Sequence, residues 1–190
     1  MKILCFGDSN TYGYDPCSYF GGRYPGKCRW VDILAGKLDC TAINAGENGR
    51  ETPSREGELL QFDQILTNHK PLDMLVIMLG SNDLLQGNLV ESVVRRMKDF
   101  LEHIDMEKSR ILLIGPVPMQ RGEWVPVQSL VDASIELTRK YRCLTELLGV
   151  GFADAGKWNV SVTFDGVHFT EEGHKSFAEG LYQVITRKGE

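Results

Sequence analysis

Several marks of common protein classes are missing from these 190 residues. No stretch approaches the roughly 20 apolar residues that a bilayer-spanning helix needs. Met1-Lys2 is followed by too few apolar residues for a secretory signal peptide. No long basic run occurs, and the formal net charge is −5, which argues against a nucleic-acid surface. We therefore expect a cytoplasmic protein with no stable membrane anchor and no nucleic-acid partner.

Cysteine is scarce and unpaired in pattern. The five cysteines are odd in number and include no C-x-x-C pair, so they read as reduced structural thiols. Internal repeats, low-complexity tracts and linker-like blocks are also missing, and the length suits one substantial core. The sequence therefore predicts a single domain over residues 1–190.

Three nucleotide-binding and hydrolase motifs are absent too. The chain has neither G-x-G-x-x-G nor G-x-x-x-x-G-K-[ST], which argues against a nucleotide-binding module. It also lacks G-x-S-x-G, the nucleophile elbow of the α/β-hydrolases.

What the sequence does contain is an alternation of strands and helices. Segments typical of buried strands lie at 3–6, 41–44, 74–79, 111–114 and 150–153. Helical spacing of apolar residues follows at 30–38, from Pro53-Ser54 to 66, 89–104, 129–148 and 170–185. In the fourth helix we expect the apolar side to carry Ile135, Tyr141, Leu144 and Leu148. This alternation predicts an α/β fold, in which helices cover both faces of a parallel sheet.

Polar loops punctuated by glycine follow four of the expected strands. They are Gly7-Asp8-Ser9-Asn10, residues 44–50, Gly80-Ser81-Asn82-Asp83 and, after a longer connection, Asp165-Gly166-Val167-His168. The carboxyl ends of parallel strands share one edge, where ligands bind in open α/β sheets. The alternative is that Ser9 and its neighbours only form a turn and a helix cap.

These loops supply the parts of an acyl-transfer site. Ser9 is the candidate nucleophile and His168 the candidate base, since histidine titrates near neutral pH. Asp165, three residues before His168, can orient the imidazole. The Ser9 N–H, the Gly49 N–H and the Asn82 amide can form an oxyanion hole.

Other acids and histidines have simpler interpretations. Adjacency to Ser9 gives Asp8 a turn-stabilising role, and Asp83 is expected to cap the next turn. His69 and His103 lie in polar contexts and should be solvated, whereas His174 should be structural. Because His168 is the one histidine at the proposed site and no cysteine joins it, we expect no metal and no cofactor.

Two loops decide the shape of the pocket. The segment from Thr11 to Arg29 is rich in aromatic residues, which favours an ordered pocket wall, although packing alone explains them as well. These aromatic residues are Tyr12, Tyr14, Tyr19, Phe20 and Tyr24. The apolar segment Trp124-Val125-Pro126-Val127 either covers the site or forms a subunit contact.

Together the four blocks resemble those of the SGNH (GDSL-type) hydrolase family, from the first strand to the last helix. The resemblance implies a flavodoxin-like three-layer α/β/α sandwich with a five-stranded parallel sheet in the order 2-1-3-4-5. It implies Ser9, Asp165 and His168 as the catalytic triad, and the Ser9 N–H, the Gly49 N–H and Asn82 as the oxyanion hole. Gly49 is chosen over Gly46 by its place in Asn-Ala-x-x-x-Gly.

The stretch from Gly7 to Tyr14, with Arg29-Trp30, is similar to the arylesterase and acetyl-esterase branch. That branch typically acts on small acyl groups and often forms oligomers. The usual fourth residue of the first block is Leu, where this chain has Asn10, a variation that does not touch the triad.

The predicted function is a serine esterase that cleaves small-molecule esters carrying aryl or acetyl groups, acetylated carbohydrates among them. The alternatives are an acyltransferase, or a thioesterase or lysophospholipase, with the same site, since all of these share the acyl-enzyme. A further alternative is a non-catalytic flavodoxin-like binding module, against which the presence of every expected site residue argues.

Overall fold

The computed structural model describes residues 1–19 and 22–187 of the chain. Within this part, five parallel strands form one sheet in the order β2-β1-β3-β4-β5. The strands are β1 (Lys2–Gly7), β2 (Thr41–Gly46), β3 (Met74–Met78), β4 (Ile111–Gly115) and β5 (Gly151–Asp154). The predicted α/β class and the 2-1-3-4-5 order are both confirmed.

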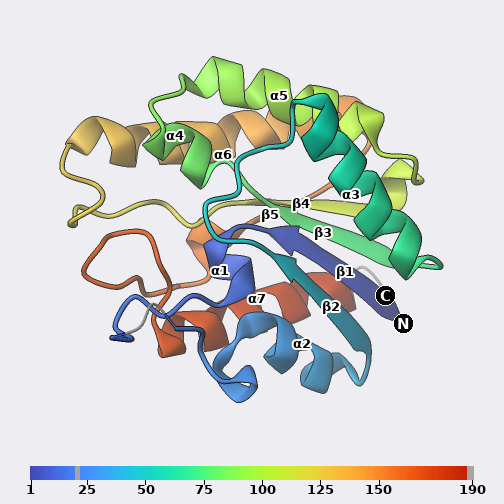
Figure 1. Cartoon of the computed structure of the whole chain (residues 1–190), viewed down its shortest axis with the longest axis horizontal. Coiled ribbons are helices and arrows are strands. Elements are labelled where there is room, and N and C mark those ends of the chain that lie inside the picture. Colours follow the sequence, from blue (N-terminus) through green and yellow to red (C-terminus); the bar gives the residue numbers. More distant parts are fainter. Residues whose placement is uncertain (20–21, 188–190) are drawn as a thin grey trace.

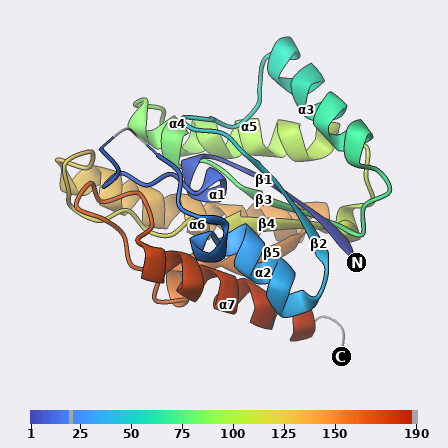
Figure 2. The ribbon, with the colours of Figure 1, turned by 60° about the horizontal axis from the view of Figure 1, so that its bottom comes forward.

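Helices cover both faces of the sheet and make it a three-layer sandwich (Figures 1 and 2). One face carries α2 (Trp30–Leu38) and α7 (Glu171–Arg187). The other face carries α3 (Glu56–His69), α5 (Val90–His103) and α6 (Gln128–Leu148). Two short helices, α1 (Ser9–Tyr12) and α4 (Ser81–Leu85), follow β1 and β3 directly. Short 3-10 turns lie at Gly26–Cys28, Lys108–Arg110 and Ala155–Lys157.

Burial on both faces explains the unbroken apolar runs of the central strands. In β3, Leu75 and Ile77 pack beneath α3, α5 and α6, whereas Val76 and Met78 pack against the α2 and α7 side. Successive side chains of a strand point to opposite faces, so a strand covered on both sides needs apolar residues at every position.

One sequence expectation for a helix was wrong in detail. Ile135 is 53% exposed, whereas Leu137, Tyr141 and Leu144 form the buried stripe of α6. Ile135 lies two residues before Leu137, which is roughly 200° around a helix of 3.6 residues per turn. Ile135 was assigned to the buried side because it is apolar, whereas the helical period places it on the exposed side.

The start of α3 lies near Pro53-Ser54, as expected. The helix begins at Glu56, because the Glu58 carboxylate accepts hydrogen bonds from the backbone N–H groups of Ser54 (2.9 Å) and Arg55 (3.0 Å). The helix thus begins just after Pro53-Ser54, close to the expected start.

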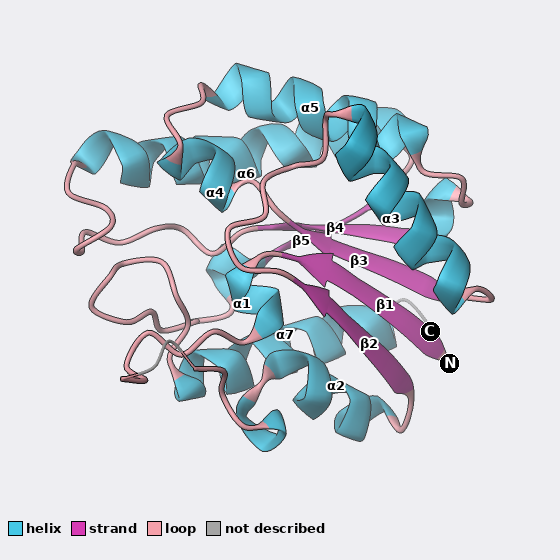
Figure 3. Ribbon diagram, viewed as in Figure 1, coloured by secondary structure: helices cyan, strands magenta, loops and turns pink. Residues whose placement is uncertain are grey.

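The loops that leave the carboxyl ends of β1, β2 and β3 gather at one side of the molecule (Figure 3). The long connections that precede α6 and α7 reach the same side. Among the described residues, no helix combines the length and the apolar content needed to cross a bilayer.

Candidate active site

Ser9 is the first residue of α1, immediately after β1. Asp8 caps this helix, since its carboxylate accepts a hydrogen bond from the Asn10 N–H at 3.0 Å. Gly13 ends the helix in the left-handed region, with φ of 89°. The predicted turn-stabilising role of Asp8 is confirmed, and the short helix presents Ser9 at the carboxyl edge of the sheet.

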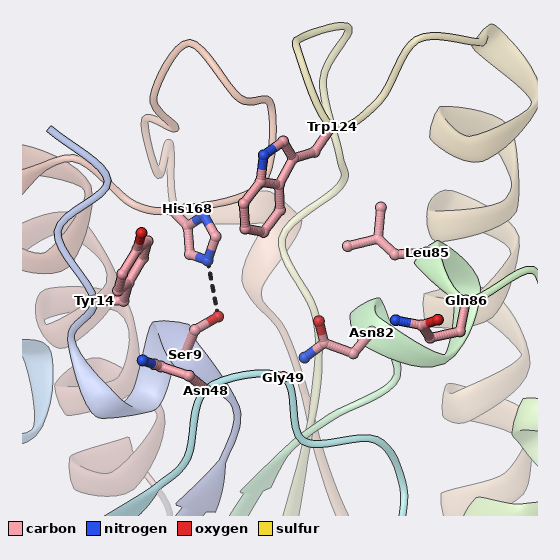
Figure 4. A pocket seen from close by; sticks show the side chains of 9 residues that line it. All are labelled: Ser9, Tyr14, Asn48, Gly49, Asn82, Leu85, Gln86, Trp124 and His168. Atoms are coloured by element: carbon pink, nitrogen blue, oxygen red, sulfur yellow. Dashed lines mark hydrogen bonds between the residues drawn. The ribbon is translucent and has the colours of Figure 1, made fainter. Parts of the chain in front are cut away.

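A hydrogen-bonded chain connects Ser9 with the loop before α7. His168 Nε2 lies 2.9 Å from Ser9 Oγ, and His168 Nδ1 lies 2.7 Å from Asp165 Oδ2. The second carboxylate oxygen of Asp165 accepts the backbone N–H groups of Val167 and His168, at 2.8 and 2.9 Å. The structure thus brings together three side chains that the sequence separates by up to 159 residues (Figure 4).

The charge state of Asp165 follows from these contacts. Burial raises the pKa of this carboxyl, but the hydrogen bonds from the His168 ring and from the His168 and Val167 N–H groups outweigh burial and lower the pKa to about 2. Asp165 is therefore a carboxylate at neutral pH, and it accepts the Nδ1 proton of His168. The proton on Nδ1 leaves Nε2 free to accept a proton from Ser9.

Two donors expected for an oxyanion hole line the same cavity as Ser9. The Gly49 N–H donates to no oxygen of the described residues, and Gly49 has φ of 76°. The Asn82 Nδ2 donates to the Arg50 carbonyl at 3.0 Å, which leaves its second N–H available. In Figure 4 this amide lies across from Ser9, with its nitrogen on the side of Gly49.

Gly46, the other candidate for the second donor, lies elsewhere. Its N–H donates to Asn44 Oδ1 at 3.0 Å. A side chain there would meet the Tyr12 nitrogen at 2.1 Å, so Gly46 permits β2 to pack against α1. Gly49 is the glycine that faces the cavity.

Arg50 connects the carboxyl ends of β1 and β2. Its Nη1 donates to the Gly7 carbonyl at 2.7 Å and also to the Ala45 carbonyl, which binds the ends of β1 and β2 together. Its own carbonyl accepts from Asn82. The residue after Gly49 thereby connects the segments that carry all three candidate donors.

Asp83 does not cap α4, contrary to expectation. Its buried carboxylate reaches across to the β2–α3 loop and accepts from the Thr52 N–H (2.9 Å) and hydroxyl (3.1 Å). Arg96 Nη1 lies 3.2 Å from its other oxygen. Asp83 therefore holds residues 50–52 beside Asn82.

A cavity of about 560 Å³ opens above Ser9. Its lining residues are Ser9, Tyr14, Asn48, Gly49, Asn82, Leu85, Gln86, Trp124 and His168. The rings of Tyr14 and Trp124 both lie 4.8 Å from the His168 ring, so aromatic walls flank the histidine. A second cavity, of about 570 Å³, lies at the amino edge of the sheet near Pro71 and Arg110 and contains no such chain of side chains.

Of the first aromatic loop, only Tyr14 among the described residues lines this cavity. Tyr12 packs under the Arg23 guanidinium, Tyr24 packs against His174, and Tyr19 is 93% exposed. Phe20 lies outside the described residues. Of the two interpretations of this loop, packing therefore describes more of its aromatic residues than a pocket wall does. Trp124 lines the cavity, as the covering interpretation of its segment requires.

The remaining histidines lie away from the cavity. His174 is fully buried, and its Nδ1 lies 3.4 Å from the Trp30 N–H. Burial, together with the nearby charge of Arg29, lowers the pKa of His174 to about 4, so it is neutral. His103 pairs with Asp63 at the surface. Within residues 1–19 and 22–187, no three His, Cys, Asp or Glu side chains cluster as metal ligands.

The chain was also compared with known protein families and solved structures. Residues 5–176 match the GDSL-like Lipase/Acylhydrolase family, whereas no match is found among curated proteins. The chain is similar to a solved carbohydrate acetylesterase family member from Sinorhizobium meliloti, with 29% identity and a TM-score of 0.82, over 97% of this chain and 96% of that one. It is also similar to the M. smegmatis aryl esterase, with 27% identity and a TM-score of 0.81, over 98% of each chain.

Proposed function

Because the chain belongs to the GDSL-like lipase/acylhydrolase family, we propose that it is a serine esterase that cleaves small-acyl esters with Ser9, His168 and Asp165. Family membership and the similarity to solved acetylesterase and aryl esterase structures make the protein a carboxylic ester hydrolase. The observation that carries the proposed mechanism is the hydrogen-bonded chain from Ser9 Oγ through His168 to Asp165 at the wall of a cavity.

In the first half-reaction, Ser9 Oγ attacks the carbonyl carbon of the ester and its proton passes to His168 Nε2. Asp165 stabilises the imidazolium that forms, and it fixes the ring orientation through Nδ1. The protonated Nε2 then gives the proton to the leaving alcohol, and the bond from the carbonyl carbon to the alkoxy oxygen breaks. The products are the free alcohol and an acyl group on Ser9.

Water completes the cycle by the same route. His168 accepts a proton from water, the hydroxide attacks the acyl carbon, and Ser9 leaves with the proton that His168 returns. In both halves, negative charge develops on the carbonyl oxygen. The N–H groups of Ser9 and Gly49 and the second N–H of Asn82 are the proposed donors to that oxygen.

The lining of the cavity is the structural support for the proposed aryl and sugar esters. Tyr14, Trp124 and Leu85 give apolar surface, and Asn48 and Gln86 line the cavity with side-chain amides. Aromatic rings beside amides suit both aryl groups and sugar rings. The similar solved structures carry the descriptions carbohydrate acetylesterase and aryl esterase, which supports the same two substrate classes.

A substrate series tests the proposal. The assay compares p-nitrophenyl acetate, butyrate and octanoate with an acetylated xylose and an acetyl thioester, for the wild type and for Ser9→Ala. We expect kcat/KM to be highest for the acetyl esters and to fall with chain length. Preference for octanoate would replace this substrate class with a lipase-like one. An alcohol added as acceptor separates hydrolysis from acyl transfer, because a transferase would give the new ester as the main product.

We retain two further expectations as part of the proposal. All five cysteines are unpaired in the structure, which supports a reducing, cytoplasmic location. A homo-oligomer remains a prediction from the arylesterase resemblance, and size-exclusion chromatography with light scattering measures it directly.

A further inference from the structure

The residue after Ser9 holds the loop that carries His168. Asn10 Nδ2 donates to the Val167 carbonyl at 3.1 Å, and Asn10 Oδ1 accepts the Phe169 N–H at 2.9 Å. One amide side chain thus grips the backbone on both sides of His168, more than 150 residues away in the sequence. The change from the usual Leu to Asn10 was expected not to touch the triad, and this was wrong, because the Asn10 amide bonds both backbone neighbours of His168. The side chain does not line the main cavity.

The backbone of Asn10 is fixed by further hydrogen bonds. Asn10 is 6% exposed, its N–H donates to Asp8 Oδ1, and its carbonyl accepts from the buried Trp30 Nε1 at 3.0 Å. Each polar group of Asn10 therefore has a partner in α1, α2 or the loop before α7. A side chain held in this way fixes the distance between the two backbones that it joins.

Few other hydrogen bonds join α1 to that loop. In the described part of the chain, the hydrogen bonds between them are the two from the Asn10 amide and the Ser9–His168 bond itself. The loop is also held by the N–H groups of Gln120, Glu123 and Trp124, by the Thr163 N–H, which donates to the His168 carbonyl at 2.7 Å, and by its own Asp165. Apart from the Ser9–His168 bond itself, the Asn10 amide thus makes the hydrogen bonds that join α1 to this loop in the described part of the chain.

We propose that Asn10 is a positioning residue that sets the distance between Ser9 Oγ and His168 Nε2. The proposal rests on the proposed function, in which His168 takes the Ser9 proton. Leucine has about the same size but neither donor nor acceptor, so it would leave the Val167 carbonyl and the Phe169 N–H buried without partners. The backbone at Val167 and Phe169 would shift to form other hydrogen bonds, and His168, which lies between them, would move with it.

The test compares Asn10→Leu with Asn44→Leu. Asn44 is the matched control because its amide also makes two hydrogen bonds next to α1, to the Thr11 carbonyl at 2.7 Å and from the Gly46 N–H at 3.0 Å. It does not contact the His168 loop. We expect Asn10→Leu to lower kcat for an aryl acetate about 10–100-fold with KM changed less than about threefold, since displacements near 1 Å cost about that much. Asn44→Leu should lose a similar amount of thermal stability and keep kcat within about threefold.

Two further readouts separate positioning from general damage. The rate at which a phosphonate labels Ser9 should fall in parallel with kcat in Asn10→Leu, and a crystal structure should show Ser9 Oγ and His168 Nε2 more than about 3.5 Å apart, beyond hydrogen-bond range. If Asn10→Leu does not fold, Asn10→Ser leaves room for water at both backbone groups and should show the same kinetic loss.

Full kcat in a folded Asn10 variant overturns the proposal, and so does an equal loss of kcat in Asn44→Leu. The failure of the proposed function is a different result, because in that case Ser9→Ala itself keeps wild-type turnover. An inactive Ser9→Ala beside a fully active Asn10→Leu would remove only the positioning role.

Discussion

Replacing Asn82 by alanine tests the proposed oxyanion hole. One N–H of its amide already donates to the Arg50 carbonyl at 3.0 Å, so a single N–H remains for a substrate oxygen. Loss of one such donor costs about 2.7–4 kcal/mol of transition-state stabilisation, or roughly 10²–10³ in kcat. Truncation also leaves the Arg50 carbonyl without its donor, and Arg50 directly follows Gly49. We therefore expect a loss toward the upper end of that range.

The measurement is steady-state hydrolysis of p-nitrophenyl acetate beside a thermal unfolding curve. KM should change little, because the hydrogen bond strengthens mainly as negative charge develops on the oxygen. Gln86→Ala is the matched control, since it removes another side-chain amide that lines the same cavity and is not one of the proposed oxyanion donors. The reasoning is refuted if Asn82→Ala keeps its kcat, or if Gln86→Ala loses as much.

Three other predictions concern charge and metals. Burial raises the pKa of Asp8 from 3.8 to about 6, and it outweighs the opposing hydrogen bond from the Asn10 N–H. The folded protein therefore keeps the Asp8 proton to higher pH than the unfolded chain does, and the free energy of unfolding falls as the pH rises from about 4 to 6. Asp8→Asn should therefore unfold with a free energy up to about 3 kcal/mol greater than the wild type at pH 8 and gain nothing at pH 4, and an equal gain at both would contradict this. Burial instead lowers the pKa of His174 to about 4, so the unfolded chain binds its proton first and stability falls as the pH drops from about 6.5 to 4. Because Asp8 contributes a slope of opposite sign over part of this window, the stability of His174→Phe is compared with that of the wild type: its free energy of urea unfolding relative to the wild type should increase as the pH drops from about 6.5 to 4, and a difference that does not change with pH would argue against a buried neutral His174. Esterase activity should survive dialysis against a chelator, whereas a loss that a divalent ion restores would reveal a metal requirement.

The fold was predictable because its strands are buried on both faces. Residues 74–79 read as a buried strand from their unbroken apolar run, and β3 is central in the sheet. The order 2-1-3-4-5 came from the resemblance to a family, since periodicity does not say which strands are neighbours. Ile135 shows where the prediction failed. It was assigned to the buried face of its helix because it is apolar, whereas the helical period gives that face to Leu137 and Tyr141.

The convergence of Ser9, His168 and Asp165 followed from one geometric rule, since the carboxyl ends of parallel strands share an edge. Their catalytic roles stay a prediction. The aromatic contacts of Tyr14 and Trp124 with His168 were not predictable, because they depend on the paths of two irregular loops.

Backbone geometry decided two further points that the sequence left open or misjudged. Gly49 faces the cavity and Gly46 packs against α1, which only the packing of β2 reveals. Asp83 binds Thr52 across two loops instead of capping its own helix, a long-range contact that carries no local signal.

The most direct test of the central claim is covalent labelling by a serine-directed phosphonate, followed by mass spectrometry of the peptide that contains Ser9. We expect one label per chain on Ser9, with activity lost in proportion to labelling. Ser9→Ala should take up no label and turn over esters at least about 10³-fold more slowly than the wild type, while melting cooperatively. A label on another residue that accounts for the loss of activity, or wild-type turnover by Ser9→Ala, would contradict the assignment of Ser9 as the nucleophile.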